Sequence, residues 1–294
     1  YHWDLPLALE KEGGWTNREI LGWFQEYVRI CALSFGDRVK NWIVLNEPMV
    51  FTGAGYFLGI HAPGKKGLGN FLPSAHHAVL CQAIGGRILR SLVADAQIGT
   101  TFSCSQITPY RNNRKDHIAA KKADAILNRL FTEPSLGLGY PMDTIRILKR
   151  MDKYIEPGDA QTFAFDFDFV EIQNYTREGV TLFLVVSSIG GKIGGASHAP
   201  GVPLTAMKWE VYPPSIYHLI KDRIAYPFVK KIIITESGSA FPDEVKDGEV
   251  HDPLRLAYLQ QHMAQVLKAK QEGGKVAGYF IWTLTDNFEW AEGY

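Results

Sequence analysis

The sequence predicts an α/β fold, a (β/α)8 barrel, from three observations. Segments with the pattern of strands alternate with segments of helical pattern along all 294 residues. The strand segments are apolar at consecutive positions, as in parallel strands that are covered on both faces. Polar and aromatic residues directly follow several of these strands, which is where the active sites of (β/α)8 barrels lie.

The first elements can be read from their start and stop signals. Residues 1–6 have the pattern of a strand end. A helix is predicted to follow, because apolar residues recur at helical spacing between the capping-box sequence Thr16-Asn17-Arg18-Glu19 and Gly36. The apolar run 41–46 is predicted to be a strand, since Pro48 disfavours helix at Glu47.

The same alternation continues to the end of the chain. Further helices are expected near 76–94, 116–131, 215–224 and 253–272, and further strands near 98–104, 169–174, 231–235 and 277–284. With the opening segment, this makes six predicted strands and five crossover helices. The glycine-rich stretch 190–201 is interpreted as a surface loop.

The polar residues favour a barrel over a doubly wound sheet, which would place its ligand at one switch point after a Gly-x-Gly-x-x-Gly sequence. The cluster Gly53, Gly55 and Gly59 has a different spacing, so we predict no dinucleotide site. The polar and aromatic residues follow five strands instead: His2 and Trp3, Asn46 and Glu47, Gln173 to Tyr175, Glu236, and Trp282 to Trp290. No linker or repeat divides residues 1–294, so we expect a single barrel domain.

Composition excludes several classes of function. The chain is 46% hydrophobic, and its 31 basic and 31 acidic side chains cancel, which leaves no basic field for nucleic acid or a membrane surface. No apolar run is long enough to span a bilayer. Three scattered cysteines, without metal-like spacing, are typical of a reducing compartment, so we expect a cytoplasmic location.

Two acidic residues stand at strand ends with unusual neighbours, Glu47 between Asn46 and Pro48, and Glu236 after a run of isoleucines. Taken singly, each is more often a carboxylate that faces solvent or pairs with Arg. Two such acids at the rim of one barrel are what glycosidic cleavage needs, one to protonate the leaving oxygen and one to attack the anomeric carbon.

Aromatic and polar side chains near these acids suit a sugar. Trp209, Trp282, Trp290 and Tyr175 offer flat apolar faces, whereas His2, Asn46, Gln173 and Glu289 offer hydrogen bonds to hydroxyl groups. Each tryptophan alone would more often be a core residue. Their grouping at strand ends predicts a pocket.

A set of motifs in this order resembles glycoside hydrolase family 1, the retaining β-glucosidases and β-galactosidases. The motifs are Tyr1-His2-Trp3-Asp4-Leu5-Pro6, Glu12-Gly13-Gly14-Trp15, Phe35-Gly36-Asp37-Arg38-Val39, Asn46-Glu47-Pro48, His61-Ala62-Pro63-Gly64, Trp209-Glu210, Ile234-Thr235-Glu236, and Asp286 to Tyr294. Two motifs depart from the family pattern. Gln173-Asn174-Tyr175 stands where Asn-Tyr-Tyr is usual, and Ser237 follows Glu236 where Asn is usual.

The resemblance implies a role for each candidate residue. Glu47 would be the general acid/base, Glu236 the nucleophile and Tyr175 the support of Glu236. Trp282 would be the stacking platform, and its peptide bond to Thr283 would be cis. The substrate-binding residues would be His2, Trp3, Asn46, Gln173, Trp209, Trp282, Glu289 and Trp290.

The resemblance also implies the reaction, a double displacement on terminal β-linked, non-phosphorylated sugars without cofactor or metal. The two catalytic carboxyl groups are then expected about 5–5.5 Å apart. A small β-glycoside or oligosaccharide would be the partner. A catalytically silent sugar- or partner-binding module is the alternative, and glucose, galactose and fucose are not distinguished.

The opening segment resembles the third strand of the family barrel. We therefore expect an incomplete barrel, truncated at both ends, with six of eight strands present and strands 1 and 2 missing. Such a chain would expose two sheet edges and apolar surface. We expect it to be insoluble alone, or soluble as a homo-oligomer.

Overall fold

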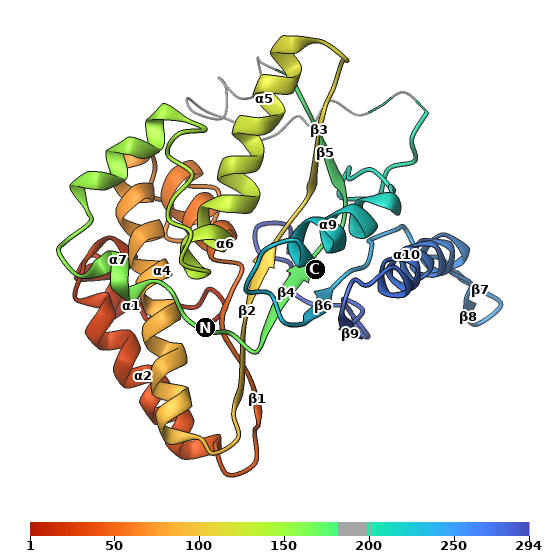
Figure 1. The fold of residues 1–294 in the computed structure, drawn as a ribbon. Helices are drawn as coiled ribbons and strands as arrows, with labels where there is room; N and C mark the ends of the chain where they lie inside the picture. Colours follow the sequence, from red (N-terminus) through yellow and green to blue (C-terminus); the bar gives the residue numbers. More distant parts are fainter. Residues whose placement is uncertain (182–198, 200, 294) are drawn as a thin grey trace. The chain divides into compact units, whose positions relative to one another are not determined.

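A computed structural model describes residues 1–181, 199 and 201–293 (Figure 1). The chain divides into two compact units. Unit 1 comprises Tyr1–Ser103, Asp124–Glu171 and Glu289–Gly293, and unit 2 comprises Cys104–Ala123 and Ile172–Phe288. Of the predicted loop 190–201 only residues 199 and 201 are described, so that prediction lies outside the described part of the chain.

Unit 1 is built on parallel strands covered by helices. Strand β1 (Asn41–Asn46) pairs in parallel with β2 (Gln97–Ser103), and the first residues of β4 (Phe169–Gln173) extend the order to β1-β2-β4. Its α-helices are α1 (Leu7–Lys11), α2 (Ile20–Phe35), α3 (Pro48–Thr52), α4 (Leu68–Leu92), α6 (Leu130–Ser135) and α7 (Asp159–Thr162). Gly14–Thr16 and Arg146–Lys153 form 3₁₀-helices, and Gly53–Leu58 and Ala125–Arg129 form π-helices.

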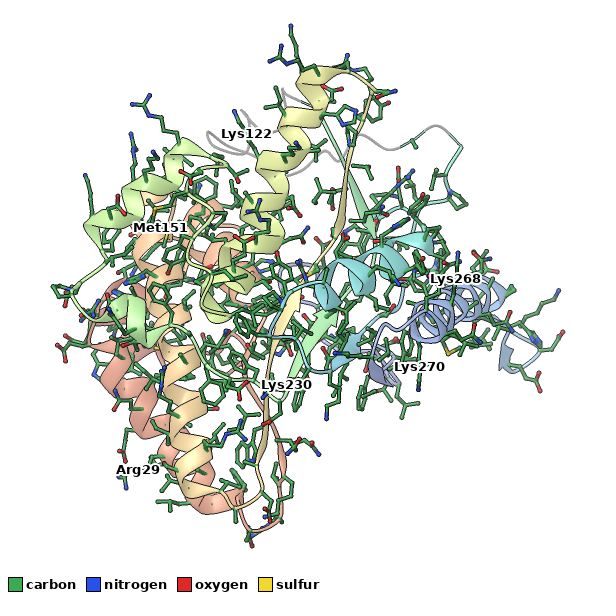
Figure 2. The ribbon with its side chains drawn as sticks, in the orientation of Figure 1. Arg29, Lys122, Met151, Lys230, Lys268 and Lys270 are labelled. Carbon is green, nitrogen blue, oxygen red and sulfur yellow. The ribbon has the colours of Figure 1, made fainter. Side chains whose placement is uncertain are left out.

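Helices α2 and α4 lie side by side in Figure 1, and the pattern of α2 explains why. Its buried residues Ile20, Phe24, Val28 and Ala32 recur every four positions, so they form one apolar face. On α4, a Cβ at Gly85 would lie 3.0 Å from the Phe24 ring, so glycine allows the two helices to approach closely. Figure 2 shows Arg29 on the outer, polar side of α2.

The start of α2 differs from the predicted capping box. The helix begins at Ile20, and the Thr16 hydroxyl donates back to the Gly13 carbonyl at 2.7 Å. Asn17 instead accepts the Glu19 amide at 3.0 Å. The capping-box prediction was therefore wrong, because Thr16 belongs to the short 3₁₀ turn that precedes the helix.

The opening segment pairs with β1 at Tyr1. The Tyr1 nitrogen donates to the Val44 carbonyl at 3.0 Å, and the Asn46 amide donates to the Tyr1 carbonyl at 2.9 Å. The chain then bends at Trp3, and no strand is assigned to residues 1–6. Of the predicted strand end, Tyr1 alone forms strand-like hydrogen bonds with β1.

Unit 2 contains the end of β4, followed by β6 (Ile232–Glu236) and β9 (Val276–Tyr279) in the order β4-β6-β9. Unit 2 also contains a small parallel pair, β3 (Gln106–Pro109) with β5 (Arg177–Val180). A short hairpin is formed by β7 (Val245–Lys246) and β8 (Glu249–Val250). In the described part of this unit the helices are α5 (Arg114–Asp124), α9 (Pro214–Ile224) and α10 (Pro253–Gln271). Strand β9 ends at Tyr279 rather than Leu284, because the Trp282 amide already donates to the Ser237 carbonyl outside the sheet.

Among the described residues, no helix is long and apolar enough to cross a membrane. Nor do His, Cys, Asp and Glu side chains gather anywhere in that part of the chain as a group that could hold a metal ion.

Two buried histidines predict how stability responds to acid. Burial lowers the pKa of His77 and of His262 to about 4, and both side chains are at most 4% exposed. In the unfolded chain these groups bind a proton below about pH 6.5, so the unfolded state binds more protons between pH 6.5 and 4. As the pH is lowered from 6.5 to 4, we therefore expect the free energy of unfolding to fall by about 3 kcal/mol for each histidine.

Urea titrations at pH 7 and pH 4.5 measure this loss. In the variant His262→Gln the loss should be visibly smaller, since one titrating group has been removed. The matched control is His251→Gln, because His251 is exposed. This variant should lose as much free energy of unfolding between pH 7 and pH 4.5 as the unsubstituted chain. An equal loss in all three proteins would contradict the prediction.

Candidate active site

Glu47 is placed by a single-residue turn between β1 and α3 in unit 1. Strand β1 ends at Asn46 and Pro48 opens the helix, so Glu47 turns the chain with φ 46° and ψ 59°. This left-handed conformation costs a residue other than glycine about 1–3 kcal/mol and persists only where neighbours fix it. The Glu47 amide is held by the Thr101 carbonyl of β2 at 3.1 Å, and the residue is 8% exposed. A buried carboxyl group thus stands at the carboxyl end of β1.

Trp290 is enclosed by aromatic rings in unit 1. Its ring stacks on Trp3 with the centroids 4.2 Å apart and on His61 with the centroids 4.5 Å apart. His2 approaches the same ring edge-on at 5.7 Å. Burial lowers the pKa of His2 and of His61, so both imidazoles are neutral at pH 7 and can exchange hydrogen bonds with hydroxyl groups.

Glu289 precedes Trp290 in a tight loop. Its amide donates to the Gly293 carbonyl at 2.7 Å, and the Gly293 amide donates to the Glu289 carbonyl at 3.1 Å. The loop therefore fixes the backbone on both sides of Trp290. Glu289 therefore belongs to the same loop of unit 1 as Trp290.

Glu236 ends β6 in unit 2, and both oxygens of its carboxyl group accept short hydrogen bonds. Gln173 donates from Nε2 to Oε1 at 2.5 Å, and the Tyr175 hydroxyl donates to Oε2 at 2.5 Å. The backbone is held as well, since the Asn174 amide donates to the Glu236 carbonyl at 3.1 Å. Two donors on two oxygens fix the orientation of this carboxyl group.

Tyr175 is itself supported from α10. Tyr258, which is 1% exposed, donates its hydroxyl to the Tyr175 carbonyl at 2.9 Å. The next residue back, Asn174, donates its side-chain amide to the carbonyls of Cys104 and Thr176. The segment that carries Tyr175 is therefore tied down at two consecutive residues.

The two tryptophans of unit 2 are Trp209 and Trp282. The Trp209 ring lies 5.3 Å from the Tyr175 ring. Trp282 follows β9, and the peptide bond from Trp282 to Thr283 is cis, which confirms the expectation. A Cβ at Gly238 would lie 2.1 Å from the Trp282 carbonyl oxygen, so glycine is required where the loop after Glu236 passes Trp282.

Unit 1 brings together Trp3, His2 and Trp290, while Gln173, Tyr175, Trp209 and Glu236 meet in unit 2. Glu47 belongs to unit 1 and Glu236 to unit 2, so the separation of their carboxyl groups stays a prediction. Sequence reasoning missed two contributors, His61 and Tyr258. His61 had a signal, because it opens one of the motifs, whereas Tyr258 has only the spacing of a core residue.

The whole chain, residues 1–294, matches the profile of Glycosyl hydrolase family 1. The chain belongs to this family. Beta-glucosidase A of Thermotoga maritima is 38% identical to it over 100% of this chain and 65% of its own length. A 1,4-beta-D-glucan glucohydrolase of Thermotoga neapolitana is 36% identical over 100% of this chain and 68% of its own length.

Solved structures of family 1 proteins agree. A beta-glucosidase from Thermotoga maritima in complex with deoxynojirimycin superposes with a TM-score of 0.91 and 37% identity, over 100% of this chain and 65% of that one. This family 1 chain therefore has an α/β fold that matches a solved (β/α)8 barrel, in agreement with the predicted incomplete barrel, and it spans 65% of the length of Beta-glucosidase A. A 6-phospho-beta-galactosidase of Clostridium acetobutylicum also matches, at 29% identity.

Proposed function

We propose that the protein is a retaining exo-β-glycosidase in which Glu236 attacks the anomeric carbon. The observation that carries the proposal is the pair of 2.5 Å hydrogen bonds from Gln173 and Tyr175 to the two oxygens of Glu236. Donors on both oxygens favour the ionised carboxylate. An ionised and oriented carboxylate is the form that a nucleophile needs.

Glu47 is proposed as the general acid/base. It would protonate the departing oxygen in the first step and deprotonate the attacking water in the second. Its burial supports this role, because a buried carboxyl group disfavours its charged form and is better suited to hold a proton. The two acids alone supply the chemistry of the double displacement.

The proposed substrates are terminal β-linked sugars without a phosphate group. The segment 284–294 carries the acids Asp286, Glu289 and Glu292 and contains no Lys or Arg. A phosphorylated sugar that contacts this segment would meet like charge without a compensating cation, and such juxtapositions disfavour binding. The neutral His2 and the stacked Trp290 suit an uncharged ring.

Turnover of two chromogenic substrates tests the function and its specificity together. We expect release of nitrophenol from 4-nitrophenyl β-glucoside, at a kcat/KM at least about 100-fold above that of the corresponding 6-phosphate. The matched 4-nitrophenyl α-glucoside is the control and should not react. Absence of turnover on every β-glycoside would contradict the proposed activity, and a preference for the 6-phosphate would contradict the proposed specificity alone.

Removal of one hydroxyl group tests the support of Tyr175. Tyr258→Phe keeps the ring but leaves the Tyr175 carbonyl without its 2.9 Å donor. A lost neutral hydrogen bond is worth about 1 kcal/mol, so we expect kcat to fall about fivefold with little change in KM. The reason is that the displaced Tyr175 hydroxyl would orient Glu236 less well.

The matched control for this variant is Tyr217→Phe, which removes an exposed hydroxyl that donates to Glu272. Its kcat should equal that of the unsubstituted protein. Should Tyr258→Phe lower the melting temperature and leave kcat unchanged, Tyr258 would have a structural role only.

A cytoplasmic location is proposed as well. Cys31, Cys81 and Cys104 are all free thiols. Unpaired cysteines are typical of proteins from reducing compartments.

A further inference from the structure

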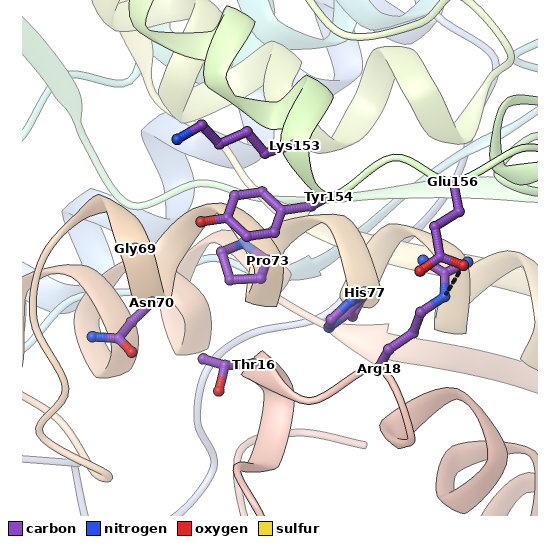
Figure 3. A pocket seen from close by; sticks show the side chains of 9 residues that line it. All are labelled: Thr16, Arg18, Gly69, Asn70, Pro73, His77, Lys153, Tyr154 and Glu156. Carbon is purple, nitrogen blue, oxygen red and sulfur yellow. Dashed lines mark ion pairs between the residues drawn. The ribbon is translucent and has the colours of Figure 1, made fainter.

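A pocket lies in unit 1, and it shares no residue with the aromatic group around Trp290 (Figure 3). Its volume is about 410 Å³, which is the size of a small-molecule site. Asn70, Pro73 and His77 of α4 line it, with Thr16 and Arg18 on one side and Tyr154 and Glu156 on the other.

The charges that surround this pocket cancel. Arg18 forms an ion pair with Glu156, with 3.1 Å between Nε and Oε2, and donates two hydrogen bonds to Asp159, at 2.6 and 3.1 Å. Burial opposes the ionisation of Asp159, but the hydrogen bonds from Arg18, the Glu156 amide and His76 outweigh it and lower the pKa to about 2. Lys153 is the second cation. Arg18, Lys153 and Glu156 line the pocket, whereas Asp159 pairs with Arg18 without lining it. These two cations and two carboxylates together carry no net charge.

His77 lines the pocket and carries one hydrogen-bond acceptor. Its Nδ1 lies 2.9 Å from the Trp15 carbonyl oxygen, which can only accept, so Nδ1 carries the proton. Burial lowers the pKa of His77 to about 4, so the ring is neutral at pH 7 and Nε2 keeps its lone pair. A lone pair repels an anion and accepts from a hydroxyl group.

The other side chains of the pocket include both donors and acceptors for the hydroxyl groups of a ligand. The Thr16 oxygen and the Asn70 Oδ1 remain acceptors, since Thr16 donates to Gly13 and Asn70 donates through Nδ2 to the Lys66 carbonyl. The Tyr154 hydroxyl and the Lys153 ammonium are donors. Tyr154 and Pro73 add apolar surface beside these groups, as Figure 3 shows.

We propose that this pocket is a second sugar site, which binds a neutral pyranose through its hydroxyl groups and through a C–H face packed on Tyr154. Donors and acceptors in one uncharged pocket match hydroxyl groups, because each hydroxyl both donates and accepts. The aromatic ring and Pro73 match the apolar face of a pyranose. The site goes beyond the proposed activity and needs neither Glu47 nor Glu236.

Two-bond ¹H–¹⁵N spectra of the histidine rings test the proposal, with glucose as the probe at pH 7. The free protein should show His77 protonated on Nδ1, and glucose should move the His77 Nε2 resonance in a saturable way. Comparison with His77→Gln assigns the resonance. In Tyr154→Ala the apparent Kd for glucose, measured from the His77 resonance, should rise at least about fivefold. The shift of the His2 resonance on addition of glucose should be unchanged. Tyr110→Ala, which changes an exposed tyrosine of unit 2, should leave both responses unchanged.

Three results would overturn the second sugar site. The first is a His77 resonance that glucose does not move up to about 0.5 M. The second is an equal His77 response in the unsubstituted protein and in Tyr154→Ala. The third is a saturable response of His77 to inorganic phosphate but not to glucose, which would mark an anion site.

Discussion

Glu236→Gln is expected to lose nearly all turnover, at least about 10⁴-fold in kcat, on every β-glycoside that the protein hydrolyses. An amide cannot form the covalent glycosyl intermediate, and no other group takes its place. The side chain keeps its size, so Gln173 and Tyr175 would still surround it. The loss would therefore report on chemistry rather than on packing.

The measurement is the steady-state hydrolysis of 4-nitrophenyl β-glucoside, accompanied by a thermal melt of each protein. Glu272→Gln is the matched control, because Glu272 is an exposed acid of the same unit that accepts from Tyr217. It should retain full turnover. A folded Glu236→Gln protein that keeps more than about one per cent of the activity would exclude Glu236 as the nucleophile.

The fold could be predicted from the sequence where burial alone decides the pattern. Strands β1, β2, β4 and β6 were each expected within one or two residues, because short runs rich in apolar and β-branched residues, alternating with helical segments, favour strands covered on both faces. The pair β3 and β5 was missed, since Gln106–Pro109 and Arg177–Val180 are short, half-buried and mixed in polarity. Such strands owe their pairing to neighbours far along the chain.

Local signals failed where a neighbouring side chain offered a competing partner. Thr16 has the right residues after it for a capping box, but the Glu19 amide donates to the Asn17 side chain instead. The role of Tyr258 was invisible for a different reason. A tyrosine at core spacing shows nothing of its hydroxyl, whose partner is the carbonyl of a residue in another element.

In the candidate site, motifs identified residues whose backbone conformation residue preferences would not predict. Glu47 and Trp290 both adopt positive φ, at 46° and 37°, although neither is glycine. Asp95, Lys208, Asp247 and Lys275 share this conformation and are not candidate site residues, so a positive φ does not by itself mark the site. Glu47 and Trp290 were selected by their motifs.

Glu47→Ala should separate the two steps of the proposed reaction. With a leaving group that needs no proton, such as 2,4-dinitrophenolate, the first step should be nearly unaffected. The second step should slow about 10²- to 10⁴-fold, because no base remains to activate water. Azide needs no base, and the space left by the carboxyl group admits it, so added azide should restore turnover and yield the β-glycosyl azide.

Product analysis by NMR together with the initial rate checks this outcome. Glu26→Ala is the control, since Glu26 is an exposed acid of α2 paired only with Arg29 among the described residues, and azide should leave its rate unchanged. In a small variant of Glu236, azide can only enter from the side that the nucleophile used, so the product there should be the α-glycosyl azide. If Glu47→Ala gives the α-product, or if the two variants respond alike to azide, the assignment of acid/base and nucleophile is wrong.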